Sequence, residues 1–158
     1  MYFVSIWESV KHHERFREIA MINQENDIAK RFIPLTQAMS AAGDKLIRYQ
    51  LELVQGTAIP ALESKNTEFV IITPKEGVSL ERIREVGLDV HDVWDTNGHP
   101  IALWESVEGD RTFLIIVGWL STTHHYDTVK NEPYASVVNA FSQVGNFNIS
   151  HAHLEKNI

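Results

Sequence analysis

The sequence predicts an α+β fold, and two observations support this class. Short apolar runs rich in β-branched residues alternate along the chain with segments whose apolar residues recur at helical spacing. In addition, the stretch around Trp119 is repeated near the start of the chain. The aligned pairs are Trp7 with Trp119, Ser9 with Ser121, His12 with His124 and His13 with His125. The chain therefore contains an internal repeat, which bears on its architecture more than any single motif does.

Composition and charge exclude several classes of protein. The 158 residues are 44% hydrophobic and 22% charged, which is typical of a folded chain with a buried core. The net charge of −7 and the lack of a basic block argue against nucleic acid and against a membrane surface as partners. The absence of cysteine excludes disulfides and thiolate sites. The longest apolar run, Phe113–Leu120, is too short to cross a bilayer, and we expect a soluble, cytoplasmic protein.

The first third of the chain predicts a strand, two helical stretches and a second strand. Tyr2–Trp7 is rich in β-forming residues, and Ser9 is placed to cap the helix that follows. Ile28–Ala42 has helical spacing, and Leu46–Val54 alternates in the manner of a strand with one wet face. Residues 56–66, with glycine, proline and several polar residues, predict a linker.

The rest of the chain predicts elements in the order β-α-β-β-α-β. The strands are expected at Glu68–Thr73, Ile101–Ser106, Thr112–Trp119 and Phe147–Leu154. The first helix follows the capping residue Ser79 and runs to about Val93. The second runs from about Ser121 to Gln143, with a break near Pro133. This order is the split βαβ arrangement of ferredoxin-like domains, an antiparallel four-stranded sheet with both helices on one face.

The two parts of the chain therefore predict unequal units. We expect a partial β-α-β repeat at residues 1–55, a linker at 56–66 and a complete ferredoxin-like domain at 67–158. The sheet face away from the helices is also apolar, and a bare face of that kind would be a large exposed patch. We expect a second sheet to cover it. That sheet could come from a second copy of the chain, in a homodimer, or from chain upstream of Met1.

Several motifs around Trp119 resemble those of the dimeric α+β barrel superfamily. The motifs are Gly118-Trp119 at a strand end, Ser121, His125, the helix break Glu132-Pro133-Tyr134, and Trp104 on the preceding strand. The superfamily includes antibiotic-biosynthesis-monooxygenase-like domains and stress-responsive barrel domains of fungal type. The spacing from Trp119 to Pro133 is one residue longer than usual in that superfamily. Whether His124 or His125 faces a pocket therefore stays open.

The resemblance implies two sheets packed face to face and a pocket between each sheet and its helices. It also implies a range of chemistry: cofactor-free oxygenation of polycyclic phenols, polyketide cyclisation, haem degradation or dechlorination-type reactions, besides members without assigned catalysis. The tyrosine–histidine pair of plant polyketide cyclases is not reproduced, since Thr128–Glu132 contains neither residue. That difference argues against their particular mechanism.

Eight histidines are many for a chain of this length, and several are candidates for chemistry. His151 and His153 alternate on a predicted strand, so both could face one ligand or a metal. His151 is alternatively a core histidine or a pocket base. His125 stands at a helix start, where the dipole favours the neutral imidazole that serves as a general base. The repeated pair His12 and His13 favours a structural role for the motif, because both copies carry it.

Four aromatic residues complete the candidate site. Trp104 and Trp119, on neighbouring strands, could wall a flat substrate or fill the core. Tyr126 is a candidate proton donor, and His99 lies in a turn before a proline. A glycine-rich phosphate loop, a nucleophile elbow and an HExxH metal helix are all missing from the sequence.

The favoured hypothesis is a cofactor-independent enzyme of secondary metabolism, of the cyclase, isomerase or monooxygenase type. It would act on an apolar aromatic or polyketide-like small molecule by histidine acid–base catalysis. The candidate catalytic residues are His125, His151 and Tyr126, and the candidate substrate-binding residues are Trp104, Trp119, His153 and His99. We expect neither a cofactor nor a metal. The hypothesis predicts a closed pocket of roughly 300 Å³ or more that contains His125 or His151, and a structure with both rings in bulk solvent and no such pocket would rule it out.

Two alternatives remain. One is a non-catalytic stress-responsive or ligand-binding barrel whose main role is assembly. The other is haem or metal handling through His151 and His153. A helix-side interior packed solid by apolar side chains would favour the first alternative.

Overall fold

The computed structural model describes residues 4–22, 30, 33–34, 37, 41, 47, 49–109 and 111–155. The chain divides into two compact units, Met1–Gln50 and Leu51–Ile158. In the first unit, α1 spans Val10–Ile22, and Ser9 caps it by accepting a hydrogen bond from the amide of His12. Residues 4–7, the described part of the strand predicted at 2–7, form no strand. Most of the helix predicted at 28–42 lies outside the described residues.

The second unit is built on one five-stranded antiparallel sheet. Its strands are β1 (Leu51–Gly56), β2 (Asn66–Pro74), β3 (Ile101–Ser106), β4 (Phe113–Trp119) and β5 (Gly145–Ala152), in the spatial order β1-β3-β4-β2-β5. The helices are α3 (Ala58–Leu62), α4 (Leu80–Thr96), α5 (Thr122–Thr128) and α6 (Tyr134–Val144). The series β2-α4-β3-β4-α6-β5 is the predicted β-α-β-β-α-β order, so the α+β, ferredoxin-like fold class is confirmed.

The helix boundaries follow local sequence signals. Ser79 caps α4 by accepting a hydrogen bond from the backbone amide of Arg82. Ser121 caps α5 in the same way, through the amide of His124. The predicted break near Pro133 is present, because the chain leaves helical conformation between α5 and α6. These signals are local in sequence, which is why they could be predicted.

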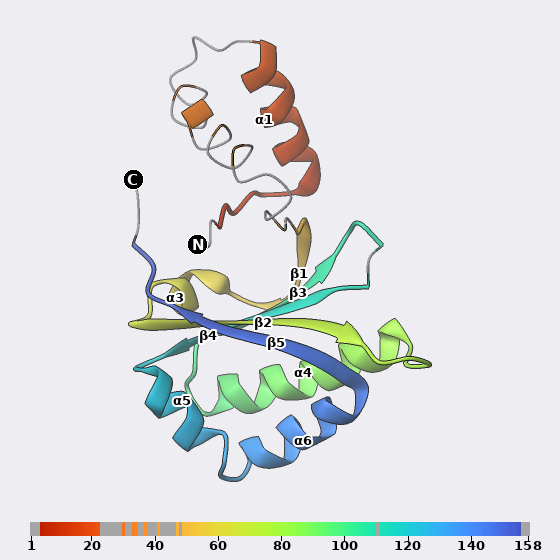
Figure 1. Cartoon of the computed structure of the whole chain (residues 1–158), viewed down its shortest axis with the longest axis vertical. Helices are drawn as coiled ribbons and strands as arrows, with labels where there is room; N and C mark the ends of the chain where they lie inside the picture. Colours follow the sequence, from red (N-terminus) through yellow and green to blue (C-terminus); the bar gives the residue numbers. More distant parts are fainter. Residues whose placement is uncertain are drawn as a thin grey trace. The chain divides into compact units, whose positions relative to one another are not determined.

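The main core lies between the sheet and the helices α4 and α6, which cover the same face (Figure 1). Side chains at alternate positions of β4, namely Phe113, Ile115 and Val117, point into it together with Ile72 of β2. Helix α4 contributes an apolar stripe at helical spacing, and α6 contributes Tyr134 and Phe141. All of these side chains are buried, so the helix side of the sheet is well packed.

The opposite face of the sheet is partly covered by α3, a helix within the segment that was predicted as a linker (Figure 1). Ala58 and Ala61 of α3 pack on Phe69, Ala102 and Ile116 of the sheet. The segment at 56–66, predicted as a linker or an irregular crossover, therefore contains a short helix, α3. Its small side chains bring the helix close to the strands, and burial against the sheet stabilises a helix too short to be stable alone.

Strand β1 begins later than the strand predicted at 46–54 and joins the sheet of the second unit. It pairs antiparallel with β3, where Leu51 lies opposite Ser106, and the register shifts at a bulge between Leu53 and Gln55. No helix among the described residues is long and apolar enough to span a bilayer.

Candidate functional site

A cluster of two buried residues, Glu68 and His125, and the half-buried His151 lies on the helix side of the sheet. Glu68 of β2 and His151 of β5 are directly opposite each other in the antiparallel register. Their side chains therefore emerge on the same face of the sheet. His125 reaches the same place from α5, which follows β4 directly. Three separate elements thus bring together two imidazoles and one carboxyl group.

The three side chains form a continuous chain of polar contacts, with a hydrogen bond between the two histidines and an ion-pair contact between His125 and Glu68. His151 Nε2 lies 3.0 Å from His125 Nδ1. The other ring nitrogen of His125, Nε2, lies 3.4 Å from Glu68 Oε1. Glu68 and His125 are buried, with 4% and 5% of their surface exposed, whereas His151 is half-buried. The cluster therefore has an inner end at Glu68 and an outer end at His151.

Trp119 fixes the inner end of the cluster. Its indole Nε1 donates a hydrogen bond of 2.6 Å to Glu68 Oε2, which leaves Oε1 to face His125. The indole and the His125 imidazole lie with ring centroids 4.8 Å apart. Trp119 is itself 2% exposed, so it holds both groups in place from within the core.

Burial shifts the proton affinities of the cluster toward the uncharged forms. Desolvation raises the pKa of Glu68 from 4.5 to about 7, although the hydrogen bond from Trp119 acts in the opposite direction. Desolvation, followed by the neighbouring charge of His151, lowers the pKa of His125 from 6.5 to about 4. Desolvation also lowers the pKa of His151. Near neutral pH the histidines are uncharged, and Glu68 exchanges its proton easily.

This arrangement can carry a proton from the surface to the interior. A neutral imidazole donates through one nitrogen and accepts through the other, so His125 can pass a proton between His151 and Glu68. A carboxyl group with a pKa near 7 can hold or release that proton at little cost. The cluster therefore has the chemistry of a general acid–base relay. Because it offers two imidazoles and one carboxylate, it also has the donor set of a metal site.

Tyr126 stands beside the outer end of the relay. Its ring centroid lies 4.8 Å from that of His125 and 5.9 Å from that of His151. Half of the tyrosine is exposed, as is half of Ile149, two residues before His151 on β5. The accessible side of the relay is thus bordered by one aromatic and one aliphatic side chain.

The remaining candidates from the sequence lie elsewhere. Trp104 faces the opposite side of the sheet, in the core under α3, so it shares no wall with Trp119. His153 lies beyond the end of β5, where its Nδ1 is 3.1 Å from the carbonyl of Lys65. His99 packs on Trp119, at 4.6 Å between ring centroids, and burial lowers its pKa.

Helix α5 determines which of the two adjacent histidines, His124 or His125, faces the cluster. His125 points into the cluster, while His124 lies near Trp119 and His99, at 5.7 Å and 5.8 Å between ring centroids. The Nδ1 atom of His124 is buried without a hydrogen-bond partner. Adjacent residues of a helix face different ways, so only His125 joins the relay.

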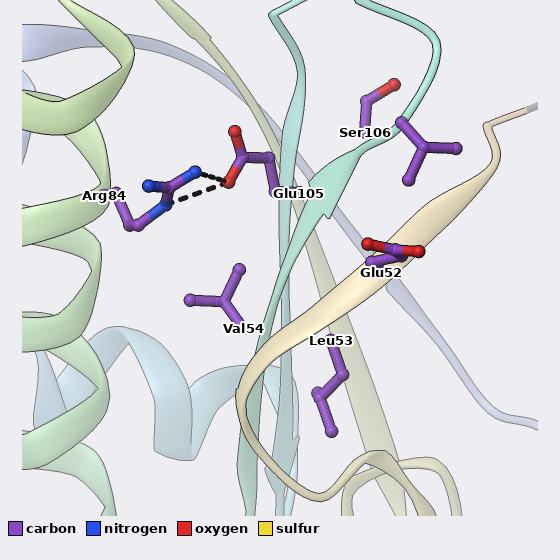
Figure 2. Close-up of a pocket in the computed structure, with 7 residues that line it drawn as sticks. Glu52, Leu53, Val54, Arg84, Glu105 and Ser106 are labelled. Carbon is purple, nitrogen blue, oxygen red and sulfur yellow. Dashed lines mark hydrogen bonds and ion pairs between the residues drawn. The ribbon is translucent and has the colours of Figure 1, made fainter. Parts of the chain in front are cut away.

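Two hollows lie away from the relay. One, of about 400 Å³, opens between β1, β3 and α4, and Figure 2 shows Arg84 of α4 reaching Glu105 of β3 there. The Nε atom of Arg84 donates to that carboxylate at 2.9 Å, which offsets repulsion from Glu52 on the neighbouring strand. The second, of about 300 Å³, is lined by His99 and by turns around Gly56 and Gly98. Neither hollow is lined by His125 or His151, so neither is the expected closed pocket.

Glu68 is the member of the cluster that the sequence reasoning missed. It stands near the start of the apolar run EFVIIT, at an alternate position that faces the helices with Val70 and Ile72. A carboxyl group on the core-facing side of a strand is seldom buried without a partner. A glutamate on the core-facing side of a predicted strand was therefore the sequence signal that could have identified Glu68 as a site residue.

Comparisons with known proteins support the fold. No family model matches the chain, and no curated protein matches it either. Among solved structures, SnoaB, a cofactor-independent oxygenase from Streptomyces nogalater, aligns with a TM-score of 0.50 at 10% identity, over 60% of this chain and 98% of SnoaB. A conserved protein of unknown function from Bacteroides thetaiotaomicron aligns at 0.48 and 14% identity, over 58% of this chain and 99% of that protein. At 10% identity, the likeness to SnoaB shows a shared fold alone.

Proposed function

We propose that this chain is an oxygenase-like enzyme of the dimeric α+β barrel superfamily that works by histidine acid–base chemistry. The observation that carries the proposal is the buried chain from Glu68 through His125 to His151. A buried carboxyl group and a buried imidazole cost stability unless they are paired, and functional sites are where such perturbed pairs gather. The shared fold with SnoaB is compatible with this class of activity.

In the proposed reaction, the outer histidine is the group that meets the substrate. His151 takes a proton from an acidic C–H or phenolic O–H of the substrate and passes one on to His125. As positive charge develops on the imidazoles, the carboxylate of Glu68 stabilises that charge by accepting a hydrogen bond, or the proton itself, from His125 Nε2. Trp119 keeps Glu68 oriented throughout. The catalytic residue is His151, and the other three act through it.

The surroundings of His151 favour an apolar, flat substrate. Tyr126 and Ile149, both half-exposed, flank the imidazole at the surface formed by α5 and β5. An aromatic or polyketide-like ring can stack on the tyrosine while its acidic proton faces the histidine. In an oxygenase reaction, the deprotonated ring carbon would reduce O₂. A methylene group and O₂ would then give a carbonyl group and water, with no organic cofactor.

Deuterium exchange tests the acid–base step separately from the oxygenation. A panel of polycyclic phenols and anthrones is incubated with the protein in D₂O without oxygen, and NMR follows exchange at the acidic ring carbons. We expect the protein to accelerate exchange for some members, and His151→Gln to reduce the acceleration by about 10²–10⁴-fold. Admitting air should then produce O₂ uptake with the same substrates.

The internal repeat supplies a matched control. His13→Gln alters the histidine that aligns with His125 but has no place in the relay, so exchange should proceed at the wild-type rate. His125→Gln should slow it. If no panel member exchanges faster than in buffer, and none shifts the NMR signals of His151 or Tyr126, the acid–base function is wrong.

One observation favours a second candidate, a ligand-binding barrel without catalysis. The helix-side interior is filled by buried apolar side chains, and the hollow beside His99 offers about 300 Å³ away from the relay. In that case the same panel would shift NMR signals around His99 and Gly98 and leave His151 unchanged. Binding there without exchange would support this candidate over the enzyme.

We also propose that two copies associate through the sheet faces opposite α4 and α6. Support comes from Leu53, half-exposed on that face, and from the apolar Trp104 and Leu114 around α3. Native mass spectrometry would report the mass and any retained ligand together. A dimer that dissociates in Leu53→Asp is expected, whereas a monomeric wild-type protein would refute the association.

A further inference from the structure

We propose that Glu68, His125 and His151 also form a binding site for a divalent transition-metal cation of the zinc type. Each residue offers one ligand atom, and these three atoms lie within 4.8 Å of one another. Two imidazole nitrogens and one carboxylate oxygen form a donor set that suits Zn²⁺ and Fe²⁺. This donor set differs from the strand pair His151 and His153 suggested by the sequence, because His153 is engaged with the carbonyl of Lys65.

The geometry needs only a small adjustment to bind an ion. Ligand atoms around a tetrahedral Zn²⁺ lie about 3.4 Å apart, given metal–ligand bonds of about 2.1 Å. The separations of 3.0 Å and 3.4 Å along the cluster are of this size, although they use different nitrogens of His125. Because the three ligand atoms already lie within 4.8 Å of one another, rotation of the half-buried His151 ring would bring its nitrogen into place beside the His125 nitrogen that faces Glu68. The outer ligand is therefore the one with freedom to move.

The neighbouring residues already supply the outer support that metal ligands require. Trp119 donates a hydrogen bond to Glu68 Oε2, which orients Oε1 toward the site and leaves it free to bind. Trp119 also packs on the ring of His125, and the burial of both residues excludes competing water. On the outer side, the half-buried His151 would let water or a substrate approach as a fourth ligand, as in an open zinc site.

A bound cation and the proton relay exclude each other. The ion takes the lone pairs that Glu68, His125 and His151 use to pass a proton, and its binding displaces the protons held between them. A cation at this site would therefore stop the acid–base chemistry proposed above. Metal binding does not depend on that chemistry, so either proposal can fail alone.

Titration of the chelator-treated protein with Zn²⁺ tests the site. The wild type, Glu68→Gln, His151→Gln and His153→Gln are compared by calorimetry, and Co²⁺ is added in parallel to record visible absorption. We expect one ion per chain in the wild type. Loss of a residue that only supports a metal ligand lowers metal affinity by about 10–100-fold. Glu68→Gln and His151→Gln each remove a ligand, so each should lower the Zn²⁺ affinity by more than that. Trp119→Phe removes only a supporting hydrogen bond to Glu68, so its loss of Zn²⁺ affinity should stay within about 10–100-fold.

The histidine variants discriminate between three outcomes. If His153→Gln binds like the wild type while His151→Gln does not, the proposal holds. If both lose binding equally, the ion sits on the strand pair and the proposal is wrong. If every variant binds Zn²⁺ as tightly as the wild type, the ion binds only at surface histidines, and the proposal is also wrong.

Wild-type protein alone gives a second test that needs no variant to fold. The ring nitrogens of His125 and His151 should both shift on adding Zn²⁺ in ¹⁵N NMR spectra, while those of His153 stay unchanged. Zn²⁺ at a tenfold excess that shifts neither ring would overturn the proposal, whatever the deuterium-exchange result shows.

Discussion

The two copies of the internal repeat form the same local corner but differ in what surrounds it. In the Trp7 corner (Trp7, Ser9, His12 and His13), the serine hydroxyl accepts the amide of the first histidine at 3.1 Å, as in the Trp119 corner (Trp119, Ser121, His124 and His125). The tryptophan lies 4.9 Å from the second histidine in one and 4.8 Å in the other. It lies 5.8 Å and 5.7 Å from the first. Local sequence alone therefore sets the geometry of the corner.

The difference lies in burial and in the glutamate partner. In the Trp7 corner a histidine meets a glutamate at 3.4 Å, but Glu8 lies just before α1, four residues from His12, and both side chains are exposed. In the Trp119 corner the same distance separates His125 from Glu68, which comes from a strand and is buried. The corner is thus a structural motif, and the second copy differs because the sheet brings Glu68 and His151 to it.

The largest expected difference between the corners is in packing. Trp119→Ala should lower the free energy of unfolding by about 3–5 kcal/mol, because it removes a buried indole from the core. Trp7→Ala should cost less than about 1 kcal/mol, since its site is only partly buried. Urea unfolding followed by far-ultraviolet circular dichroism measures both. Equal costs would show that the Trp7 corner is as well packed as the other.

The next effect concerns the pH dependence of stability. The pKa of Glu68 is about 7 in the folded chain and 4.5 ordinarily. Protonation of Glu68 therefore stabilises the folded state at low pH, and this contribution to the free energy of unfolding is lost as the pH rises from about 4.5 to 7. The pKa of His125 is about 4 instead of 6.5. The neutral imidazole therefore stabilises the folded state at higher pH, and this contribution to the free energy of unfolding is lost as the pH falls from about 6.5 to 4. These trends have opposite signs and offset each other in the wild type.

Single substitutions should separate the two trends. In Glu68→Gln, stability should rise with pH between about 4 and 6.5 more steeply than in the wild type, and in His125→Gln it should fall between about 4.5 and 7. Each change should amount to about 1–3 kcal/mol. His99 and His151, whose pKa values are also lowered, are present in both variants and cancel in the comparison. His13→Gln should keep the wild-type profile, and parallel profiles in all proteins would refute the assignment.

The serine caps should matter equally in the two corners. Ser9→Ala and Ser121→Ala each remove one acceptor at the same distance, and each should cost about 1 kcal/mol in local stability. Amide hydrogen exchange at His12 and His124 measures this cost. A much larger loss at His124 would mean that tertiary contacts, and not the cap, hold the second corner.

The smallest effect is expected at the exposed pair of the first corner. Glu8→Gln should change stability by less than about 0.5 kcal/mol, because both side chains are largely solvated. Thermal unfolding at low and at high salt is a sufficient test. A cost above 1 kcal/mol that disappears at high salt would show that the pair is more protected than its exposure indicates.

The ferredoxin-like order was predictable because its signals are local. Ser79 and Ser121 cap helices, Pro133 directly precedes α6, and apolar alternation marks the strands. Helix α3 was not predictable in this way. Its five residues include Pro60, and they are helical because Ala58 and Ala61 pack on strands far away in the sequence.

For the site, the residues were easier to predict than their grouping. His125, His151 and Tyr126 were named from residue type and position, and they do lie together. Glu68 was missed because its pairing with His151 depends on the register between β2 and β5. Local sequence patterns do not predict that register. The sequence left Trp104 and Trp119 as either walls of a substrate site or core residues, and both pack in the core, on opposite faces of the sheet.

The pairing of Glu68 with His151 has a consequence for how the sequence of this protein can change. The two residues meet only while β2 and β5 keep their present alignment. Deleting one residue from β5 before His151 would let the strand pair again, but it would turn that imidazole to the other side of the sheet. Substitutions along these strands are therefore tolerated more easily than changes in their length. Insertions in the turn at Glu108–Gly109, which joins β3 to β4, leave the alignment of β2 with β5 intact.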